Sequence, residues 1–238
     1  MKALILNSGL GARMGGITAN RPKCLVNLDD EETILGRQLK LLKDVGIKEV
    51  VITTGIYEND IREYCNNLGL DFKYTFVNNS LSNKTNYIYS IYLAKEFLDD
   101  SIVLMHGDLV FDYQVLNNLM NCKESVVAVS TTNELPEKDF KAVLKEEFIE
   151  KIGVEFFENA IECQPLYKLN KQEWIMWLQN ICLFCENNNV KCYAENAFND
   201  ISYKCIIHPM DFKNLLCSEV DTVEDLQIIK KKLQLVED

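Results

Sequence analysis

The segment KALILNSGLGARMGG, residues 2–16, is the clearest indication of the fold of this chain. Its first part, Lys2–Leu6, is a short apolar run that predicts a buried parallel strand. Its second part, Asn7–Gly16, contains four glycines and predicts a loop. A glycine-rich loop after a strand can present backbone N–H groups to phosphate oxygens, because no Cβ blocks the approach. The stretch therefore predicts an α/β domain with an anion site at the end of its first strand.

Strand and helix patterns alternate through the first half of the chain. Apolar runs predict four more strands, at Glu49–Thr53, Asp71–Val77, Ser101–Met105 and Ser125–Ser130. Helical spacing lies between them, at Thr33–Asp44, Glu58–Asn67, Asn86–Leu98 and Val115–Met120. This alternation predicts βαβ units and a mostly parallel sheet flanked by helices.

The pattern changes after Thr131. Short runs predict an antiparallel meander, with strands at Phe140–Leu144, Glu147–Lys151 and Val154–Glu158. The spacing beyond it predicts a long helix with Trp174 and Trp177 in its core stripe, a late strand and a closing helix, at Asn170–Glu186, Ser218–Val220 and Val223–Leu233. We expect one domain over residues 1–238, in which residues 131–170 form a small antiparallel β insertion.

Composition excludes several classes of protein. The 36 acidic residues outnumber the 25 basic ones, and the net charge of -11 disfavours nucleic-acid binding. No apolar run reaches the roughly 18 residues of a membrane helix, and the N-terminus turns polar too soon for a signal peptide. Nine irregularly spaced cysteines indicate reduced thiols. We therefore expect a cytoplasmic protein without a membrane partner; the sequence leaves a homodimer open.

Two familiar phosphate-binding loops fit the glycine loop poorly. A dinucleotide fold would continue into a helix, but Arg21 and Pro22 interrupt it, and no acid ends the second strand. A P-loop would place a lysine after Gly16, where Ile17 stands. The loop instead combines Arg13 with Lys23, and two such cations above a strand end can flank a triphosphate.

Two aspartates lie at predicted strand ends. Asp108 follows the strand Ser101–Met105, and Asp221 precedes the closing helix. Open α/β sheets bind ligands at this edge, and aspartates there can hold the Mg²⁺ that a triphosphate requires. The alternative is structural: Asp108 would cap a turn and Asp221 would be a helix N-cap.

Together these motifs resemble the sugar-phosphate nucleotidylyltransferase superfamily. Within it, the segment TNYIYSIYL, residues 85–93, resembles one typical of small cytidylyltransferases that activate phosphocholine, 2-aminoethylphosphonate or phosphoglutamine. The resemblance implies a Rossmann-like, GT-A-like mixed sheet. It also implies Mg²⁺-dependent transfer of CMP from CTP to a small phosphorylated acceptor, with release of pyrophosphate, for surface polysaccharide modification.

The resemblance also implies roles for individual residues. Arg13 and Lys23 would be catalytic, and Asp108 and Asp221 would hold Mg²⁺. The nucleotide-binding residues would be Asn7, Ser8, Gly9, Leu10, Gly11, Asn86 and Ser90. The chain departs from the family at Asn7 and Ser8, where two alanines are usual.

The acceptor site is expected near the segment PEKDFK, residues 136–141. Choline-activating relatives tend to carry a tryptophan there, because aromatic faces hold a quaternary ammonium. Here the candidates are Phe140, Lys141 and Glu195. If Lys141 lines the pocket, it favours an anionic acceptor such as phosphoglutamine over phosphocholine, with 2-aminoethylphosphonate between them. If it is a solvated hairpin charge, this preference falls away.

Two other functions remain open from the sequence. One is a sugar-1-phosphate nucleotidylyltransferase. The other is a non-catalytic nucleotide-binding regulator. A glycosyltransferase is disfavoured, because only one acid stands in the segment His106–Asp108 where an Asp-x-Asp pair would be expected.

Overall fold

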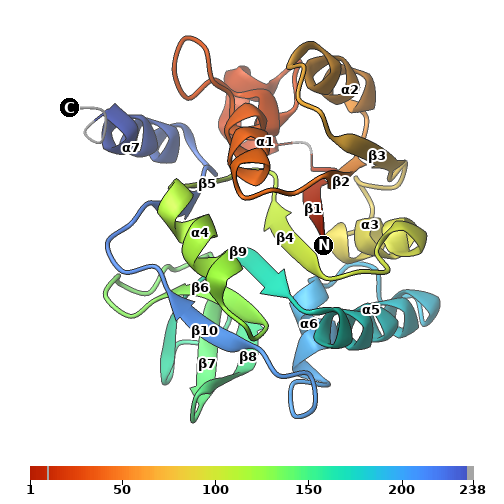
Figure 1. Ribbon diagram of the computed structural model, residues 1–238, viewed down its shortest axis with the longest axis vertical. Coiled ribbons are helices and arrows are strands. Elements are labelled where there is room, and N and C mark those ends of the chain that lie inside the picture. The colour runs from red at the N-terminus through yellow and green to blue at the C-terminus, as the bar shows by residue number, and fades with distance from the viewer. Residues whose placement is uncertain (10, 235–238) are drawn as a thin grey trace.

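The computed structural model describes residues 1–9 and 11–234, so the predicted nucleotide-binding residue Leu10 lies outside the described residues. The chain forms a nine-stranded mixed sheet whose main path runs β10-β6-β9-β4-β1-β2-β3 (Figure 1). Its strands are β1 (Lys2–Asn7), β2 (Glu49–Thr54), β3 (Lys73–Asn78), β4 (Ile102–His106), β6 (Val126–Ser130), β7 (Lys141–Lys145), β8 (Phe148–Gly153), β9 (Ala160–Leu169) and β10 (His208–Asp211).

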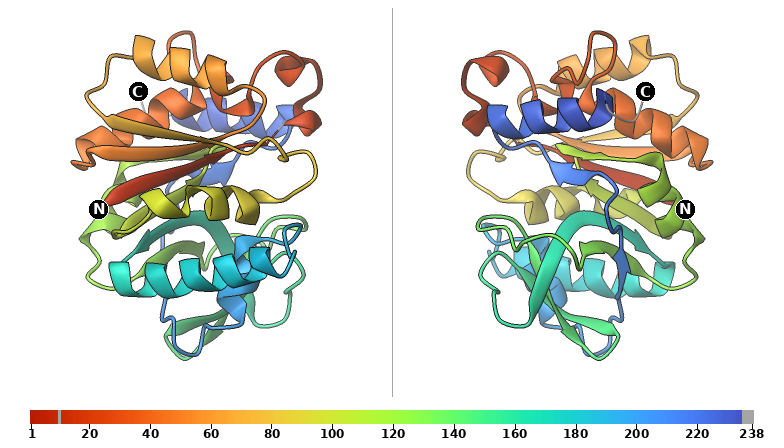
Figure 2. Two further views of the ribbon diagram at one scale, coloured as in Figure 1. Left: turned by 90° about the vertical axis from the view of Figure 1, so that its right-hand side faces the viewer. Right: turned by 90° about the vertical axis from the view of Figure 1, so that its left-hand side faces the viewer.

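Helices cover both faces of this sheet (Figure 2). They are α1 (Ile34–Asp44), α2 (Glu58–Asn67), α3 (Tyr87–Ala94), α4 (Tyr113–Asn121), α5 (Lys171–Glu186), α6 (Ala194–Asn199) and α7 (Val223–Gln234). None of the helices within residues 1–9 and 11–234 is long and apolar enough to cross a membrane.

The parallel part of the sheet confirms the predicted fold class. Strands β3, β2, β1 and β4 pair in parallel, with Leu4 of β1 opposite Val51 and Leu104. Alternate residues of β1 enter different cores, as the pleat requires. Leu4 belongs to the core that contains Trp174 of α5, whereas Ile5 belongs to the core that contains Leu39 of α1.

The predicted strand at Val154–Glu158 is wrong, because that segment is a bend without strand pairing. Three strands were not predicted: β5 (Leu109–Phe111), β9 and β10. Of these, β9 lies antiparallel between β4 and β6 in the main sheet. The register of the pairing between β9 and β6 shifts between Val127 and Val129 of β6, opposite the part of β9 that contains Pro165. Proline lacks an N–H and is tolerated in a sheet at such a bulge. Residues 131–170 therefore supply a hairpin, β7–β8, and also a central strand.

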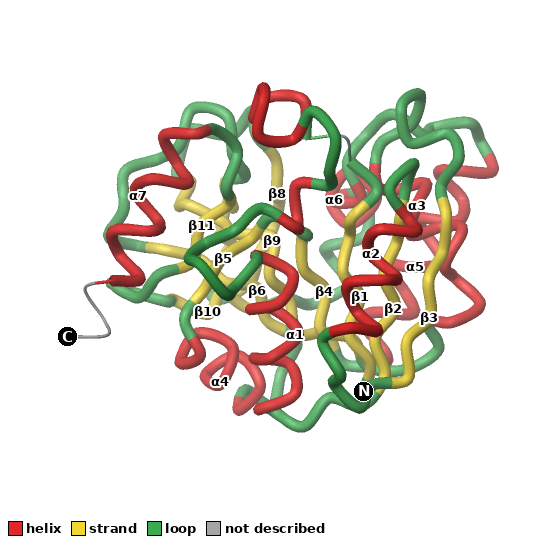
Figure 3. The backbone as a smooth tube through the Cα atoms, turned by 90° about the horizontal axis from the view of Figure 1, so that it is seen from above, coloured by secondary structure: helices red, strands yellow, loops and turns green. Residues whose placement is uncertain are grey.

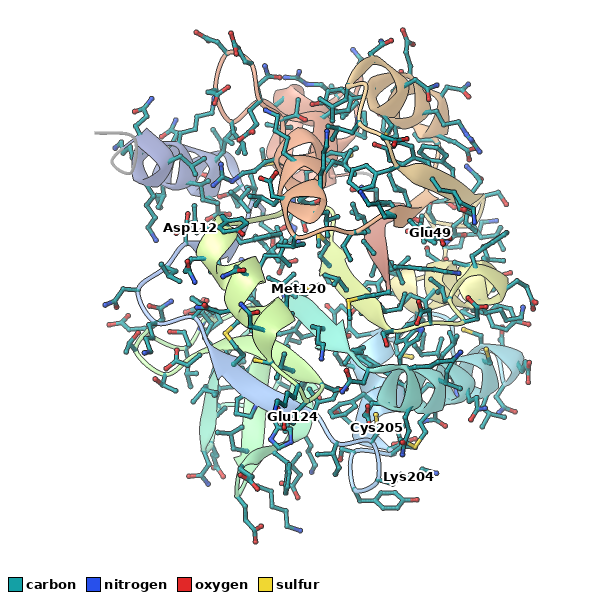
Figure 4. All side chains as sticks on the ribbon, in the orientation of Figure 1. Glu49, Asp112, Met120, Glu124, Lys204 and Cys205 are labelled. Atoms are coloured by element: carbon teal, nitrogen blue, oxygen red, sulfur yellow. The ribbon has the colours of Figure 1, made fainter. Side chains whose placement is uncertain are left out.

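A separate two-stranded sheet joins the middle of the chain to its C-terminal part. Its strands, β5 (Leu109–Phe111) and β11 (Cys217–Glu219), pair antiparallel. Asp112, labelled at the start of α4 in Figure 4, accepts a hydrogen bond from the backbone N–H of Leu216 at 2.9 Å. Figure 3 shows the following helix, α7, beside β5 and β11, at the end of the molecule opposite α5. This pairing brings residues after β11 to the end of β4.

Candidate active site

Three adjoining hollows lie where β1 and β4 end, and Asp108 lines all of them. Their volumes are about 190, 200 and 240 Å³. The loop hollow is lined by Asn7, Gly9, Gly11, Arg13 and Lys23, among others. The helix hollow is lined by Ser8, Asn79, Ser82, Thr85, Asn86 and Ser90, among others. The hairpin hollow is lined by Tyr87, Asp139, Phe140, Tyr193, Glu219 and Asp221, among others.

The glycine loop depends on Gly11. This residue has a φ of +64°, a left-handed conformation that favours glycine. A Cβ there would lie 3.0 Å from Cβ of Lys23, and the carbonyl of Gly11 accepts a hydrogen bond from Oγ1 of Thr18 at 2.8 Å. The absence of a side chain at Gly11 therefore lets the loop close over the lysine.

Lys23 joins the two predicted metal ligands. Its Nζ lies 2.6 Å from Oδ2 of Asp108 and 2.7 Å from Oδ1 of Asp221. Nη1 of Arg13 lies 3.0 Å from the other oxygen of Asp221. The structure thus brings together the four charged residues to which the resemblance assigned catalysis and metal binding.

The charges of this cluster shift one another's pKa. Burial alone would lower the pKa of Lys23, but Asp108 and Asp221 outweigh it and raise that pKa. Burial alone would raise the pKa of Asp108, but Lys23 and His106 outweigh it and lower that pKa. The lysine is therefore an ammonium and Asp108 a carboxylate at neutral pH.

Asp221 is not the N-cap of α7. Thr222 and Asp225 cap that helix: Oδ2 of Asp225 accepts from the N–H of Thr222 at 2.7 Å, and Oγ1 of Thr222 accepts from the N–H of Asp225 at 3.2 Å. The N–H of Val220 donates to the carbonyl of Asp108 at 2.9 Å, which fixes the two aspartate segments side by side. The carboxylate of Asp221 is thus directed at Lys23.

The chemistry of this cluster fits a divalent cation. The carboxylates of Asp108 and Asp221 already converge on one positive group, and Mg²⁺ prefers oxygen ligands. Potential ligand atoms of His106, Asp108 and Glu219 also lie within 4.8 Å of one another. Asp108 belongs to both sets, so it is the residue best placed to hold such an ion.

His106 and Glu219 form a partly buried pair that the sequence analysis did not predict. Nδ1 of His106 lies 2.9 Å from Oε1 of Glu219. Burial, reinforced by the charge of Asp108, raises the pKa of Glu219 to about 7. Burial alone would lower the pKa of His106, but Glu219 outweighs it and raises that pKa. Both residues stood beside the predicted aspartates, which was the only available signal.

Neutral polar groups line the helix hollow. Asn86 caps α3, and its Oδ1 accepts from the N–H of Tyr87 at 2.7 Å. Nδ2 of Asn79 donates to Oγ of Ser90 at 2.9 Å. The predicted residues Ser8, Asn86 and Ser90 therefore lie around one hollow, and Asn79 is an addition to them.

Aromatic rings and acids line the hairpin hollow. The ring of Tyr193 lies 5.1 Å from that of Phe140 and 5.9 Å from that of Tyr87, measured between centroids. Asp139 and Glu219 add carboxyl groups. Burial, with the charge of Asp221 adding to it, raises the pKa of Asp139. Of the three predicted acceptor residues, Phe140 reaches this hollow.

Lys141 and Glu195 lie behind the cleft rather than in it. Nζ of Lys141 donates to the carbonyls of Pro136 at 2.7 Å and Asp139 at 3.0 Å, so its ammonium closes the loop before β7. Glu195 is 1% exposed and accepts hydrogen bonds from the hydroxyls of Tyr87 and Tyr167. Among the described residues, neither side chain lines any of the three hollows.

Comparison with known proteins identifies both a family and a set of relatives. Residues 3–226 match the family described as MobA-like NTP transferase domain. CMP-5'-(3-aminopropyl)phosphonate synthase of Streptomyces rubellomurinus is 37% identical over 131 residues, which are 55% of this chain and 21% of the relative. CTP:phosphoglutamine cytidylyltransferase of Campylobacter jejuni is 28% identical over 54% of this chain and 52% of the relative. Choline-phosphate cytidylyltransferase of Streptococcus pneumoniae is 33% identical over 56% and 57%. The chain thus spans between a fifth and about half of these relatives.

Solved structures share the fold over nearly the whole chain. CTP:phosphocholine cytidylyltransferase from Streptococcus pneumoniae superposes with a TM-score of 0.78 and 20% identity, covering 98% of each chain. The inositol-1-phosphate CTP transferase from T. maritima also gives 0.78, with 21% identity over 98% of this chain and 96% of that one. At this identity the likeness establishes the fold alone.

Proposed function

Because this chain belongs to the family of MobA-like NTP transferase domains, we propose that it is a cytidylyltransferase that transfers CMP from CTP to a small phosphorylated or phosphonylated amine. The cluster of Arg13, Lys23, Asp108 and Asp221 carries the proposal. It lies between a hollow of neutral polar groups, which suits a nucleoside, and a hollow of rings and acids, which suits a cationic acceptor.

The proposed reaction needs positive charge more than a protein base. An oxygen of the acceptor's phosphate or phosphonate attacks the α-phosphorus of CTP, and pyrophosphate leaves with the electrons of the broken bond. A phosphate monoester has a second pKa of about 6 and is already mostly dianionic at neutral pH. Arg13 and Lys23 would hold the phosphates and oppose the charge that develops on them. Mg²⁺, held by Asp108 and Asp221, would supply further positive charge when bound.

The acceptor preference follows from the hairpin hollow. The sequence favoured phosphoglutamine on condition that Lys141 lined the pocket, and its ammonium instead binds loop carbonyls. The hollow is lined by the rings of Tyr87, Phe140 and Tyr193. Four acids and two cations also line it, so negative groups outnumber positive ones; they are Asp108, Asp139, Glu219 and Asp221, with Arg13 and Lys138. Ring faces and carboxylates attract an ammonium group. We therefore favour an aminoalkylphosphonate or phosphocholine over phosphoglutamine, with a role in surface polysaccharide modification as the wider setting.

Pyrophosphate release tests this proposal directly. Each of four nucleoside triphosphates is mixed with aminoalkylphosphonates, phosphocholine, phosphoglutamine and sugar 1-phosphates in the presence of Mg²⁺. We expect the highest kcat/KM with CTP and a cationic acceptor. Turnover confined to sugar 1-phosphates would favour the sugar-nucleotide reaction. Nucleotide binding without turnover of any acceptor would favour a non-catalytic regulator.

A further inference from the structure

Two buried polar atoms at the end of β1 have no hydrogen-bond partner within the described part of the chain: Nδ2 of Asn7 and Oγ of Ser8. Their residues are 9% and 8% exposed. Burying a polar group without a partner costs free energy, so such an atom in a cleft indicates a ligand that completes its hydrogen bonding. Both residues line the candidate active site, Asn7 in the loop hollow and Ser8 in the helix hollow.

The backbone holds Asn7 in position. Its N–H donates to Oγ1 of Thr53 at 3.3 Å, and β1 is fixed between β2 and β4. The side chain rests on Gly107, where a Cβ would collide with Oδ1 of Asn7. Gly107 therefore provides the room that this asparagine needs. The amide nitrogen is the buried atom of this side chain that has no protein partner.

The surroundings of Asn7 select the chemistry of its partner. An amide nitrogen can only donate a hydrogen bond. Asn7 lies in the loop hollow with the backbone and cationic groups of an anion site, and with Asp108 at the shared edge. These groups are Gly9, Gly11, Arg13 and Lys23. A hydrogen-bond donor among such groups matches an anionic oxygen. The partner that fits Asn7 is therefore a phosphate group of the nucleotide.

Ser8 has a different environment. Its hollow is lined by the neutral amides and hydroxyls of Asn79, Ser82, Thr85 and Ser90, besides His106 and Asp108 at the shared edge. A hydroxyl can donate and accept. This set of groups matches the hydrogen-bonding edge of a base or the hydroxyls of a sugar, both of which are uncharged.

We propose that these consecutive residues divide nucleotide recognition: Asn7 binds the phosphates through Nδ2, and Ser8 binds the nucleoside through Oγ. The inference rests on the proposed function, because it presupposes a nucleotide in the cleft. In this proposal Asn7 and Ser8 add side-chain contacts to the backbone contacts that a glycine loop provides. A smaller residue at either position would leave only backbone contacts.

Calorimetric titration of the full chain tests this division with three probes: CTP, cytidine and inorganic triphosphate. Asn7→Ala should weaken CTP and triphosphate about tenfold and leave cytidine unchanged, since one hydrogen bond to a charged group is lost. Ser8→Ala should weaken CTP and cytidine about fivefold and leave triphosphate unchanged. Tyr74→Phe is the matched control, because it removes another buried, unpartnered hydroxyl on β3 and should change none of the three affinities.

The outcomes separate this inference from the proposed function. If Asn7→Ala weakens cytidine instead of triphosphate, or if either variant binds CTP as the wild type does, the division is wrong. If the wild type prefers another nucleotide, the CTP proposal fails and the variants are compared with that nucleotide and its nucleoside. If the wild type binds no nucleotide, both fail. Asn7→Ser and Ser8→Cys repeat the test if an alanine variant does not fold by circular dichroism.

Discussion

The ammonium of Lys23 bridges the carboxylates of Asp108 and Asp221, at 2.6 Å and 2.7 Å. The two acids come from different strand ends, and the lysine comes from the loop that follows the glycines. A single cation thus joins the three segments that the resemblance had assigned separate tasks. A group that holds both acids is also within reach of any phosphate that the acids and a metal ion would bind.

Lys23→Ala should therefore lower kcat more than it raises the KM for CTP. A cation aimed at the transferred phosphoryl group contributes more as charge develops, by roughly 3 kcal/mol, or more than a hundredfold in rate. Steady-state kinetics over a range of CTP concentrations measures the two parameters separately. An increase in KM at constant kcat would assign Lys23 to ground-state binding.

Asp108→Asn and Asp221→Asn should each abolish turnover while the protein stays folded. An amide keeps the shape of the side chain but supplies no charge to a divalent cation. Binding of Mn²⁺ with CTP, followed by electron paramagnetic resonance, should weaken in both variants, which gives a readout independent of turnover. Asp200→Asn, an exposed site at the end of α6, is the control and should match the wild type. Near wild-type turnover at limiting Mg²⁺ would remove that aspartate from the metal site.

The sequence predicted the parts of the site that local patterns encode. The apolar run of β1 and the glycines after it placed the loop correctly, and the helix at Glu58–Asn67 has the predicted bounds. Strand β9 was missed because Pro165 and the polar residues Gln164 and Lys168 imitate a turn, although all three are buried in the sheet. The bulge that accommodates the proline forms only against β6.

Contacts that the sequence pattern does not indicate explain two further errors. Lys141 was a candidate for the pocket because it lies in the segment where choline-activating relatives tend to carry a tryptophan. Its partners are backbone carbonyls of the preceding loop, including that of Pro136. No pattern of side chains in the sequence indicates such backbone partners. The pairing of His106 with Glu219 likewise requires β5 and β11 to meet first.

Stability should fall as the pH rises from about 5 to 7, and Glu219 should account for part of the fall. Its pKa is about 7 in the folded protein and near 4.5 when it is exposed, so the folded state binds the proton more tightly. The pKa of His106 is also raised, which gives the same sign. The stabilisation of the folded state by this proton is complete at the low-pH end of the window. It is lost as the pH rises and the pair deprotonates.

Thermal melts of Glu219→Gln across this pH range measure the effect. The variant cannot ionise at this position, so its melting temperature should change less between pH 5 and 7 than that of the wild type. Asp99→Asn is the control: the ion pair with Lys2 lowers the pKa of Asp99, which therefore titrates below the window. A slope in Glu219→Gln as steep as in the wild type would contradict the assignment.

Glu195 should act on the acceptor through Tyr87. Its buried carboxylate accepts hydrogen bonds from the hydroxyls of Tyr87 and Tyr167, and only Tyr87 of these two residues lines the cleft. Glu195→Gln replaces one accepting oxygen by a donor. One tyrosine hydroxyl then loses the acceptor for its hydrogen, at a cost of about 1–3 kcal/mol in the free energy of unfolding. Steady-state kinetics should show a rise in the KM for the acceptor of about fivefold or more, with a smaller change in the KM for CTP.

Tyr87→Phe should reproduce the kinetic effect of Glu195→Gln. Tyr167→Phe should lower stability without it, because the ring of Tyr167 packs in the core against Trp177, at 5.4 Å between centroids. Equal effects of the two tyrosine variants on the acceptor KM would show that Glu195 acts through general stability and not by positioning Tyr87.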